Sequence, residues 1–427
     1  MKKTLAEWLN WQETLHLSEI DLSLDRIREV AKKLDLLSPA FPIITVAGTN
    51  GKGSTVSLFE SILKVQGYKT GSYTSPHLVE YNERIKLNTV NAKDDLIVEA
   101  FEEIDRARGT ISLTYFEFGT LAAMLIFTQQ KVDVVILEVG LGGRLDASNL
   151  WDTSLAIITS IGIDHVDWLG DDREVIAVEK SGIMRKSIPV ICGDLDPPNN
   201  IAKEAQRIGA NLYQINHAFS YQENNDETWT WKGFRKEYTL SLPALAGAFQ
   251  LNNAATVLAG LQAVNDILPT TQESLKQGLK EVSLIGRLQT IHQYPDWLID
   301  VAHNPHAAKQ LAKHLQTHPV KGKTIALFSM LKDKDIQQVV AIMGHYIDVW
   351  HIVELEGSRS TQLSELKGII NEQTPNKTVV AHQSFSNAIK SIKTSSNLQD
   401  RVVAFGSFLV VSELIKLMRP SARENSK

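Results

Sequence analysis

The residues with the clearest chemistry lie in one short segment, which reads AGTNGKGST from 47 to 55. An apolar, β-branched run precedes it at 43–46, and a helical pattern of apolar residues follows Gly53. A strand, a glycine-rich turn and a helix N-terminus present backbone N–H groups and a partial positive charge, which together form a seat for phosphate. Lys52 can reach the β- and γ-phosphates of a nucleotide, and Ser54 or Thr55 can face a magnesium ion. The segment therefore predicts nucleotide binding.

The spacing of this segment differs from that of the usual P-loop, G-x-x-x-x-G-K-[ST]. Here the glycines at 48 and 51 lie two residues closer together, and Gly53 follows the lysine. The loop is therefore not the version found in GTPases and most motor ATPases. A plain strand-to-helix turn, in which glycines serve only geometry, is the alternative. The lysine and serine, with a strand before them and a helix after them, favour nucleotide binding.

Polar side chains also follow other apolar runs, where parallel strands are expected to end. Glu138 follows the run at 134–137, and His165, which aspartates flank, follows the run at 155–158. Ligands of an open parallel sheet bind beyond the carboxyl ends of its strands, and a carboxylate beside a phosphate loop is a usual magnesium ligand. The alternatives are a carboxylate that caps a helix or pairs with Arg144, and a surface histidine. The context favours a metal site.

Other polar groups give weaker signals. Lys180 lies in the last turn of a predicted helix, where the helix dipole favours any lysine, so physical chemistry alone gives it no special role. Asp300 ends an apolar run, and His303 and Asn304 precede a helix that begins with proline. Asn304 can be simply the N-cap of that helix, which does not exclude a function.

These residues need a scaffold that brings strand ends together. Near-continuous apolar runs at 132–137 and 155–158 are typical of parallel strands buried on both faces. They alternate with helical patterns at 92–107 and 117–130, which indicates an α/β sheet with right-handed crossovers. The aromatic segment 229–234 predicts a β-hairpin at the edge of this domain.

The chain has 427 residues, too many for one ordinary core, so we predict two domains. Residues 1–285 are expected to form a P-loop ATPase-type, mostly parallel sheet flanked by helices. Residues 286–427 are expected to form a smaller, Rossmann-like α/β domain, with strands at 324–328, 347–353, 378–381 and 401–405.

Composition excludes several classes of protein. A formal net charge of -5 argues against a nucleic-acid binder. The single cysteine, Cys192, excludes a disulfide framework and a Cys-rich zinc site, and its place after an apolar run predicts a buried thiol. The N-terminus has no signal-peptide pattern, and no run of about 18 apolar residues occurs. We therefore expect a cytoplasmic protein without a membrane partner.

Short segments along nearly the whole chain occur in a characteristic order: 47–54, 74–78, 115–117, 137–147, 164–165, 179–182, 253–255, 286–287, 300–306 and 405–408. As a set they closely resemble the folate-modifying members of the Mur ligase superfamily, dihydrofolate synthase and folylpolyglutamate synthase. Arg144, Leu145 and Asp146, and the stretch 19–22, are similar to the bifunctional bacterial enzymes that perform both reactions.

The resemblance implies roles for individual residues. It implies ATP contacts from Asn50, Gly51, Lys52, Gly53, Ser54, Asn253, Arg287 and Asp300. It implies two magnesium ions, with ligands from Ser75, Glu138 and His165, and a carbamate on Lys180 that bears on the second ion. It implies a pterin pocket lined by Ile20, Asp21, Tyr115, Phe116, Leu145, Asp146 and Ala147, and a glutamate side formed by His303 and Ser407. The implied catalytic residues are Lys52, Lys180 and His303.

The resemblance also implies the reaction. ATP would phosphorylate a carboxylate of dihydropteroate or of a reduced folate, and the amine of L-glutamate would displace phosphate from the acyl phosphate. Phosphoryl transfer needs positioning and charge neutralisation more than covalent help, and an acyl phosphate must be protected from water, which favours a closing cleft between two domains. The implied partners are these small molecules alone, and we expect a monomer.

Other interpretations stay open. A folylpolyglutamate synthase without the first activity would use tetrahydrofolate but not dihydropteroate. A cell-wall Mur-type ligase would need an additional N-terminal domain, and the loop begins too early, at Gly48, to leave room for one. A P-loop ATPase or binding module that uses hydrolysis as a switch leaves Asp300, His303 and Ser407 unexplained, and its ATP turnover would ignore L-glutamate.

Overall fold

The computed structural model of the chain describes residues 3–16, 18, 20–293 and 295–418, which divide into two compact units. Unit 1 comprises Met1–His77, Tyr81–Ala244 and Gln250–Ser283. Unit 2 comprises Leu78–Glu80, Leu245–Phe249 and Leu284–Lys427. None of the helices in the described ranges is long and apolar enough to cross a membrane.

Unit 1 is built on an eight-stranded sheet with the order β4-β3-β2-β5-β1-β6-β7-β8. Its strands are β1 (Ile43–Ala47), β2 (Thr70–Tyr73), β3 (Ile85–Leu87), β4 (Val90–Asn91), β5 (Val134–Glu138), β6 (Leu155–Ile158), β7 (Pro189–Cys192) and β8 (Asn211–Gln214). From β2 to β8 every neighbouring pair runs parallel, whereas β3 and β4 pair antiparallel at one edge. β1, β2, β5 and β6 are fully buried, and apolar runs predict this burial for β1, β5 and β6.

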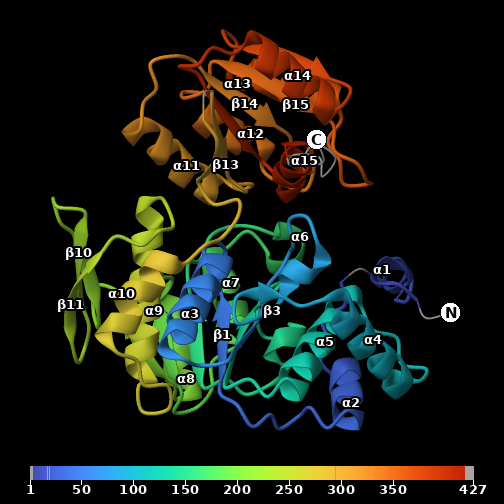
Figure 1. Ribbon diagram of the computed structural model, residues 1–427, viewed down its shortest axis with the longest axis vertical. Helices are drawn as coiled ribbons and strands as arrows, with labels where there is room; N and C mark the ends of the chain where they lie inside the picture. Colours follow the sequence, from blue (N-terminus) through green and yellow to red (C-terminus); the bar gives the residue numbers. More distant parts are fainter. Residues whose placement is uncertain (1–2, 17, 19, 294, 419–427) are drawn as a thin grey trace, which may run out of the picture. The chain divides into compact units, whose positions relative to one another are not determined.

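Helices cover both faces of this sheet (Figure 1). The helices from residue 5 to residue 281 are α1 (Leu5–Glu13), α2 (Asp25–Lys33), α3 (Lys52–Gln66), α4 (Asp94–Arg108), α5 (Tyr115–Gln129), α6 (Val166–Leu169), α7 (Arg173–Ser181), α8 (Asn199–Ile208), α9 (Ala248–Ala263) and α10 (Gln272–Glu281). The 3-10 turns are η1 (Tyr81–Arg84) and η2 (Ala147–Leu150). On one face α3 packs with α9 and α10, where Gly260 lies against Phe59 and Ile157. On the other face α4, α5, α7 and α8 cover the alternate residues of β5 and β6.

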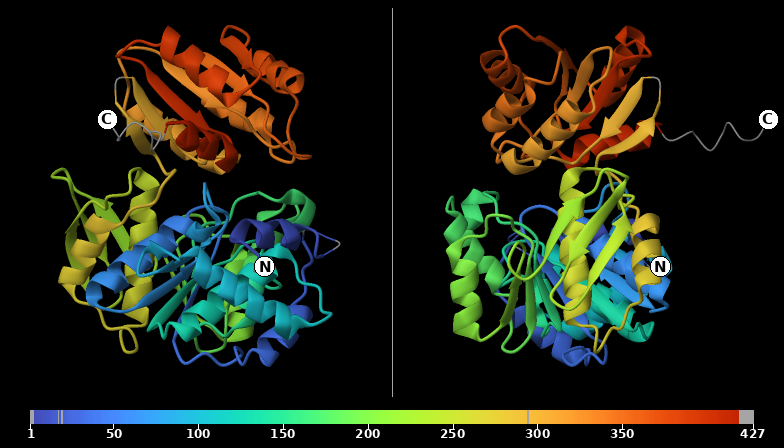
Figure 2. Two further views of the ribbon diagram at one scale, coloured as in Figure 1. Left: turned by 45° about the vertical axis from the view of Figure 1, so that its right-hand side comes forward. Right: turned by 90° about the vertical axis from the view of Figure 1, so that its left-hand side faces the viewer.

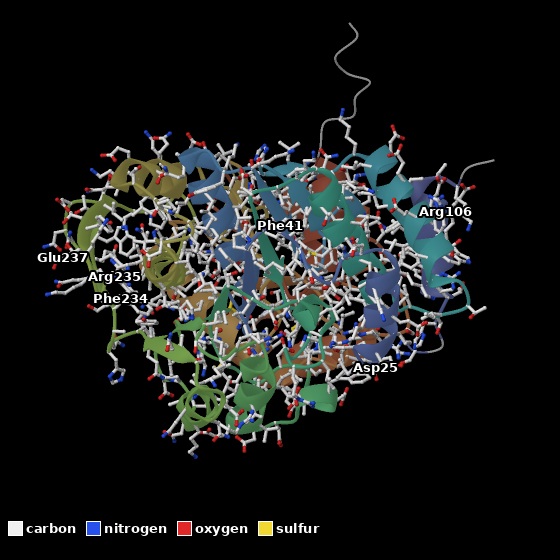
Figure 3. The ribbon with its side chains drawn as sticks, turned by 90° about the horizontal axis from the view of Figure 1, so that it is seen from below. Asp25, Phe41, Arg106, Phe234, Arg235 and Glu237 are labelled. Carbon is white, nitrogen blue, oxygen red and sulfur yellow. The ribbon has the colours of Figure 1, made fainter. Side chains whose placement is uncertain are left out.

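A separate three-stranded antiparallel sheet is formed by β9 (Ser220–Glu223), β10 (Thr228–Lys232) and β11 (Glu237–Ser241). The predicted hairpin is present as β10 and β11, and β9 is an additional strand. The indole N–H of the buried Trp231 donates to the Ala255 carbonyl on α9 (3.0 Å), which ties this sheet to the helix beside it (Figure 2). Phe234 and Arg235 lie with Glu237 at the outer end of the hairpin (Figure 3).

Unit 2 contains a six-stranded sheet with the order β12-β13-β17-β14-β15-β16, parallel except for β12. Its strands are β12 (Gln289–His292), β13 (Asp296–Ile299), β14 (Thr324–Phe328), β15 (Val349–Val353), β16 (Thr378–His382) and β17 (Arg401–Phe405). Its helices are α11 (Pro305–Thr317), α12 (Ile336–Met343), α13 (Leu363–Gln373), α14 (Phe385–Ser395) and α15 (Phe408–Met418). An apolar core lies on each face of the sheet. The predicted α/β class is therefore confirmed.

Cys192 lies at the end of β7 with no exposed surface. Burial raises the pKa of its thiol to about 12. The thiolate is the reactive form of cysteine, so this thiol is inert at neutral pH. The prediction of a buried thiol is confirmed.

Two stacked histidines lie on neighbouring strands of unit 2, the buried His351 and the half-buried His382, and they predict that acid destabilises the fold. His351 Nδ1 lies 2.8 Å from His382 Nε2, with the rings stacked at 5.0 Å. Burial first, and then His382, lower the pKa of His351 from 6.5 to about 4. Between these two pKa values the unfolded chain binds more protons than the folded chain does. The contribution of His351 to the free energy of unfolding is therefore complete above pH 6.5 and is lost as pH falls towards 4.

Between pH 7 and pH 5 the wild type is expected to lose roughly 2 kcal/mol more of its free energy of unfolding than His351→Phe does, because the phenylalanine ring cannot take up a proton. Urea unfolding of the full chain at the two pH values measures this difference. An equal pH-dependent loss in wild type and variant would contradict the assignment.

Candidate active site

The predicted phosphate loop and metal ligands lie at one edge of the unit 1 sheet. β2, β5, β1 and β6 are neighbours and run parallel, so their carboxyl ends meet there. Ser75 follows β2, Glu138 is the last residue of β5, Gly48 follows β1, and His165 lies beyond the end of β6. The sheet order thus brings together residues from four separate parts of the sequence.

The phosphate loop is held in place by the segment after β6. The Thr49 amide donates to the Ser160 carbonyl (2.7 Å), and the Thr159 hydroxyl donates to the Asn50 carbonyl (2.7 Å). A Cβ on Gly48 would overlap the Thr159 hydroxyl oxygen, so this position requires glycine. Gly51, with φ 88°, begins α3. The predicted order of strand, glycine turn and helix N-terminus is therefore present, and such a helix N-terminus can bind an anion.

Two lysines converge on one backbone carbonyl of this loop. Lys52 Nζ donates to the carbonyls of Gly48 (3.1 Å) and Thr49 (3.2 Å). Lys180 Nζ, from the last turn of α7, donates to the same Gly48 carbonyl at 3.1 Å. Lys52 is half-buried, whereas Lys180 is only 5% exposed. The structure thus brings a lysine with a weak sequence signal directly to the phosphate loop.

Lys180 has an unusual protonation equilibrium. Burial first, and then the charge of Lys52, lower its pKa from 10.5 to about 7, although Asp164 and Asp146 oppose the shift. The neutral amine is therefore well populated at neutral pH. A neutral amine can add to carbon dioxide and become a carbamate, which carries the opposite charge. The chemistry of this side chain fits the carbamate that the resemblance implies.

Asn253 reaches the phosphate loop through a residue that sequence reasoning missed. Asn253 Nδ2 donates to Gln250 Oε1 (2.9 Å), and Gln250 Nε2 donates to Ser54 Oγ (3.2 Å). A Cβ on Gly51 would meet the Asn253 amide oxygen at 2.7 Å. The signal that could have identified Gln250 is an amide one turn before Asn253 on the otherwise apolar helix α9.

The residues near the loop fit a hard cation that keeps much of its water. Glu138 is buried, and its Oε2 accepts a hydrogen bond from the Ser75 amide (3.2 Å). His165 begins α6 in the left-handed conformation, with φ 55°. The buried hydroxyl of Thr55 has no hydrogen-bond partner in the described part of the chain, whereas Ser54 pairs with Gln250.

Among the described residues, no group of three His, Cys, Asp or Glu side chains lies close enough to hold a metal. Mg²⁺ is commonly bound by one or two carboxylates together with waters and substrate phosphates. One carboxylate and nearby hydroxyls therefore fit Mg²⁺ better than they fit an ion that requires a complete protein cage.

The predicted pterin residues divide into two structural groups. In the first group, Arg26 Nη1 pairs with Asp21 (2.7 Å), and Arg26 Nη2 pairs with the buried Glu117 (3.1 Å). These two ion pairs join the segment before α2 to the start of α5. A capping box of Thr114 and Glu117 starts that helix and so places Tyr115 and Phe116 in its first turn. Ile20 neighbours Asp21 and is half-buried, and residue 19 lies outside the described ranges.

The second group lies in the loop after β5. Asp146 is buried, and its oxygens accept bonds from the amides of Gly140 (3.1 Å), Leu141 (2.9 Å) and Ser148 (2.9 Å). Its carboxylate thus shapes the loop that carries Leu145 and Ala147. A Cβ on Gly140 would meet the Phe116 ring at 2.8 Å, so the two groups are in contact.

Unit 2 gathers its own predicted residues at the ends of β13 and β17. Asp300 is buried, and its oxygens accept bonds from the amides of Leu288 (2.9 Å) and Ala302 (2.8 Å). Burial raises the pKa of Asp300, which the neighbouring charge of Arg287 partly opposes. Ser407 Oγ accepts a bond from the Leu409 amide at the start of α15 (3.1 Å).

Phe408 is the residue of this cluster that sequence reasoning missed as a contact. The Arg287 guanidinium lies 5.4 Å from the centre of its ring, and the His303 ring lies 5.8 Å from it. Asn304 is the N-cap of α11, as its alternative interpretation predicted, with Oδ1 accepting from the Ala307 amide (2.9 Å). The Phe408 ring therefore contacts two residues that lie more than 100 positions before it in the sequence.

Comparison with known proteins assigns the chain to a class. Residues 46–261 match the Mur ligase middle domain. Residues 286–408 match the Mur ligase glutamate ligase domain. The chain belongs to the Mur ligase family.

Within that family the chain is similar to one kind of enzyme over nearly its full length. It is 42% identical to the dihydrofolate synthase/folylpolyglutamate synthase of Haemophilus influenzae, with 96% of each chain covered. It is 41% identical to the enzyme of the same name from Escherichia coli, covering 97% of this chain and 95% of the other.

Solved structures give the same result. The structure of E. coli FolC in complex with DHPP and ADP has a TM-score of 0.93 at 40% identity, with 99% of each chain covered. The bifunctional folylpolyglutamate synthase/dihydrofolate synthase with Mn, AMPPNP and L-glutamate bound has a TM-score of 0.89 at 41% identity, covering 97% of this chain and 98% of that one. The predicted resemblance is therefore confirmed.

Proposed function

We propose that the protein is an ATP-dependent ligase that joins L-glutamate to dihydropteroate and to the γ-carboxyl of reduced folates. The observation that carries this proposal is 42% identity, over 96% of each chain, to an enzyme named for both reactions. The structures solved with ADP or AMPPNP, a pterin compound and glutamate support ATP, a divalent cation and these small molecules as its ligands.

The reaction requires activation of an unreactive carboxylate. ATP transfers its γ-phosphoryl group to the acceptor carboxylate, and the amine of L-glutamate then attacks the acyl carbon and releases phosphate. The loop amides and Lys52 neutralise charge on the phosphates. Magnesium ions, when bound, would add charge neutralisation beside Ser75, Glu138 and His165.

We assign the remaining roles as follows. Asn50, Gly51, Gly53, Ser54 and Asn253 contact ATP from residues 1–285, and Arg287 and Asp300 contact it from residues 286–427. The pterin packs against Ile20, Asp21, Tyr115, Phe116, Leu145, Asp146 and Ala147. His303 and Ser407 serve the glutamate side, and His303 is a catalytic residue with Lys52 and Lys180. The enzyme is proposed to act as a monomer in the cytoplasm, without nucleic-acid or membrane partners.

Lys180 is proposed to act as a carbamate. Its low pKa supports this role, because an ammonium could not capture carbon dioxide. The resulting carbamate anion would lie beside Lys52 and would attract a bound cation, whereas the lysine ammonium would repel that cation.

The activity is tested by measuring ADP release with L-glutamate and one acceptor at a time. We expect turnover with dihydropteroate and with tetrahydrofolate, and none when glutamate is omitted. Turnover with tetrahydrofolate alone would show that the protein is a folylpolyglutamate synthase without the dihydrofolate synthase activity. ATP hydrolysis that ignores both glutamate and acceptor would favour a switch ATPase instead.

Changing Glu138 to glutamine is expected to lower kcat by roughly 100-fold and to move the magnesium requirement to higher concentration. The amide keeps the shape of the side chain but removes the anionic oxygen that a hard cation prefers. A magnesium titration of activity measures both effects. Glu99→Gln on the exposed side of α4 is the control, and an unchanged titration in Glu138→Gln would make Glu138 structural.

A further inference from the structure

Arg84 is a largely buried cation whose charge no carboxylate balances. It ends the 3-10 turn η1 and is 9% exposed. Its Nε donates to His77 Nδ1 at 2.9 Å, and no aspartate or glutamate of the described residues forms an ion pair with it. A buried charge without a counter-ion is strongly unfavourable in a folded protein. We therefore expect the Arg84 guanidinium to pair with an anion when the protein performs its function.

Two aromatic rings lie beside the guanidinium but cannot neutralise it. Its central carbon lies 5.6 Å from the ring centre of Tyr81 and 5.4 Å from that of Tyr115. Cation–π contacts are worth only about 1–2 kcal/mol, which is well below the cost of an unpaired buried ion. The two ring centres lie 5.8 Å apart, so both rings lie on the same side of the guanidinium. The planar fork of a guanidinium can form two parallel hydrogen bonds to an oxyanion.

The location of Arg84 points to an acceptor substrate rather than to ATP. His77 follows Ser75 by two residues, and Tyr115 adjoins Phe116, whose ring lies 5.7 Å from that of Tyr73. Arg84 thus lies between a proposed metal ligand and a proposed wall of the pterin pocket. The phosphate loop follows β1, and β5 separates β1 from β2, beside which η1 and β3 lie. The nucleotide phosphates already have their own cationic partners in Lys52 and the loop amides.

We propose that Arg84 binds a carboxylate of the acceptor substrate. This assignment rests on the proposed function, in which every acceptor carries at least one carboxylate and an aromatic ring system. The carboxylate could be either of two groups. One is the carboxylate that is phosphorylated, which is the benzoate carboxyl in dihydropteroate and the γ-carboxyl in a folate, and the other is the α-carboxylate of a folate's glutamate, which dihydropteroate lacks. Arg84 positions the acceptor and takes no part in bond making.

The test compares binding of pteroate, a stable aromatic acid, with binding of its methyl ester, which has no charge at that end. Wild type is expected to bind the acid roughly 10- to 100-fold more tightly than the ester. Arg84→Met should bind both with equal affinity, and unfolding of the free protein should occur at an unchanged or higher temperature, because the variant removes an unpaired buried charge. Arg84→Lys keeps the charge without the fork and should retain part of the preference. Arg106→Met, on the surface of α4 (Figure 3), is the matched control.

Kinetics with the two acceptors distinguish the two carboxylates. A raised KM for both dihydropteroate and tetrahydrofolate in Arg84→Lys assigns the reacting carboxylate, and a raised KM for tetrahydrofolate alone assigns the α-carboxylate. An unchanged preference for acid over ester in both Arg84 variants, together with an unchanged KM for tetrahydrofolate in Arg84→Lys, would overturn the inference while wild-type ligation still supports the proposed function. Failure of wild type to bind pteroate, with no ligation, would overturn both.

Discussion

Replacing Lys52 with alanine is expected to lower ligation by roughly 1000-fold or more while unit 1 stays folded. Lys52 Nζ lies on the Gly48 and Thr49 carbonyls, within the loop that is proposed to hold the phosphates. Its ammonium is the mobile charge that can follow the transferred phosphoryl group. The side chain is half-buried and pairs only with backbone oxygens, so its loss should change stability little.

ADP release with L-glutamate and dihydropteroate measures this effect, and circular dichroism checks the fold. Lys64→Ala, in the last turn of the same helix, is the matched control, because Lys64 pairs with the exposed Thr89 hydroxyl. Near-normal turnover of Lys52→Ala would remove the phosphate-loop assignment.

The second large effect is expected at Lys180. Lys180→Ala should lose roughly 100- to 1000-fold in kcat, because the carbamate that would bear on the second cation cannot form. A short carboxylate such as acetate, supplied in solution, should restore part of that activity by occupying the vacated position. Lys180→Arg should not rescue activity, because a guanidinium keeps the positive charge and cannot be carbamylated.

Carbon-13 NMR of protein equilibrated with labelled bicarbonate detects the carbamate directly. The wild-type signal should be absent in Lys180→Arg and present in Lys186→Ala, which changes an exposed lysine beyond the end of α7. Full activity of Lys180→Arg would eliminate the carbamate and leave the phosphate-loop mechanism unchanged.

The sequence predicts the buried strands better than the edge strands. The strands predicted at 324–328 and 401–405 have the same bounds as β14 and β17. Each is apolar after its first residue, as is typical of strands covered on both faces. β3 and β4 were missed, since they are short and lie at an edge, and Val90 is exposed. Their pairing depends on β2, which is distant in the sequence, rather than on a local pattern.

The residues of the candidate site also divide into those that the sequence predicts and those that only tertiary contacts reveal. Glu138 and the phosphate loop could be found from the sequence, because strand ends of a parallel sheet meet at one edge. The hydrogen bond from Lys180 to the Gly48 carbonyl could not be predicted, because it joins positions 132 residues apart and depends on how α7 packs. The lowered pKa of Lys180 could not be predicted for the same reason, because burial and the neighbouring charge of Lys52 cause it. Gln250 and Phe408 were missed because only tertiary contacts give them a role.

The buried thiol of Cys192 makes the natural sequence a ready background for site-specific labelling. Maleimide reagents attack thiolates, and a fully buried thiol with a pKa of about 12 presents almost none to them. A cysteine introduced at the exposed Glu237 of unit 1 and another at Leu398 of unit 2, which is 71% exposed, would therefore carry a fluorophore pair without removal of the native cysteine. Energy transfer between the two dyes would then follow the separation of the two units in solution as ATP, acceptor and glutamate are added in turn.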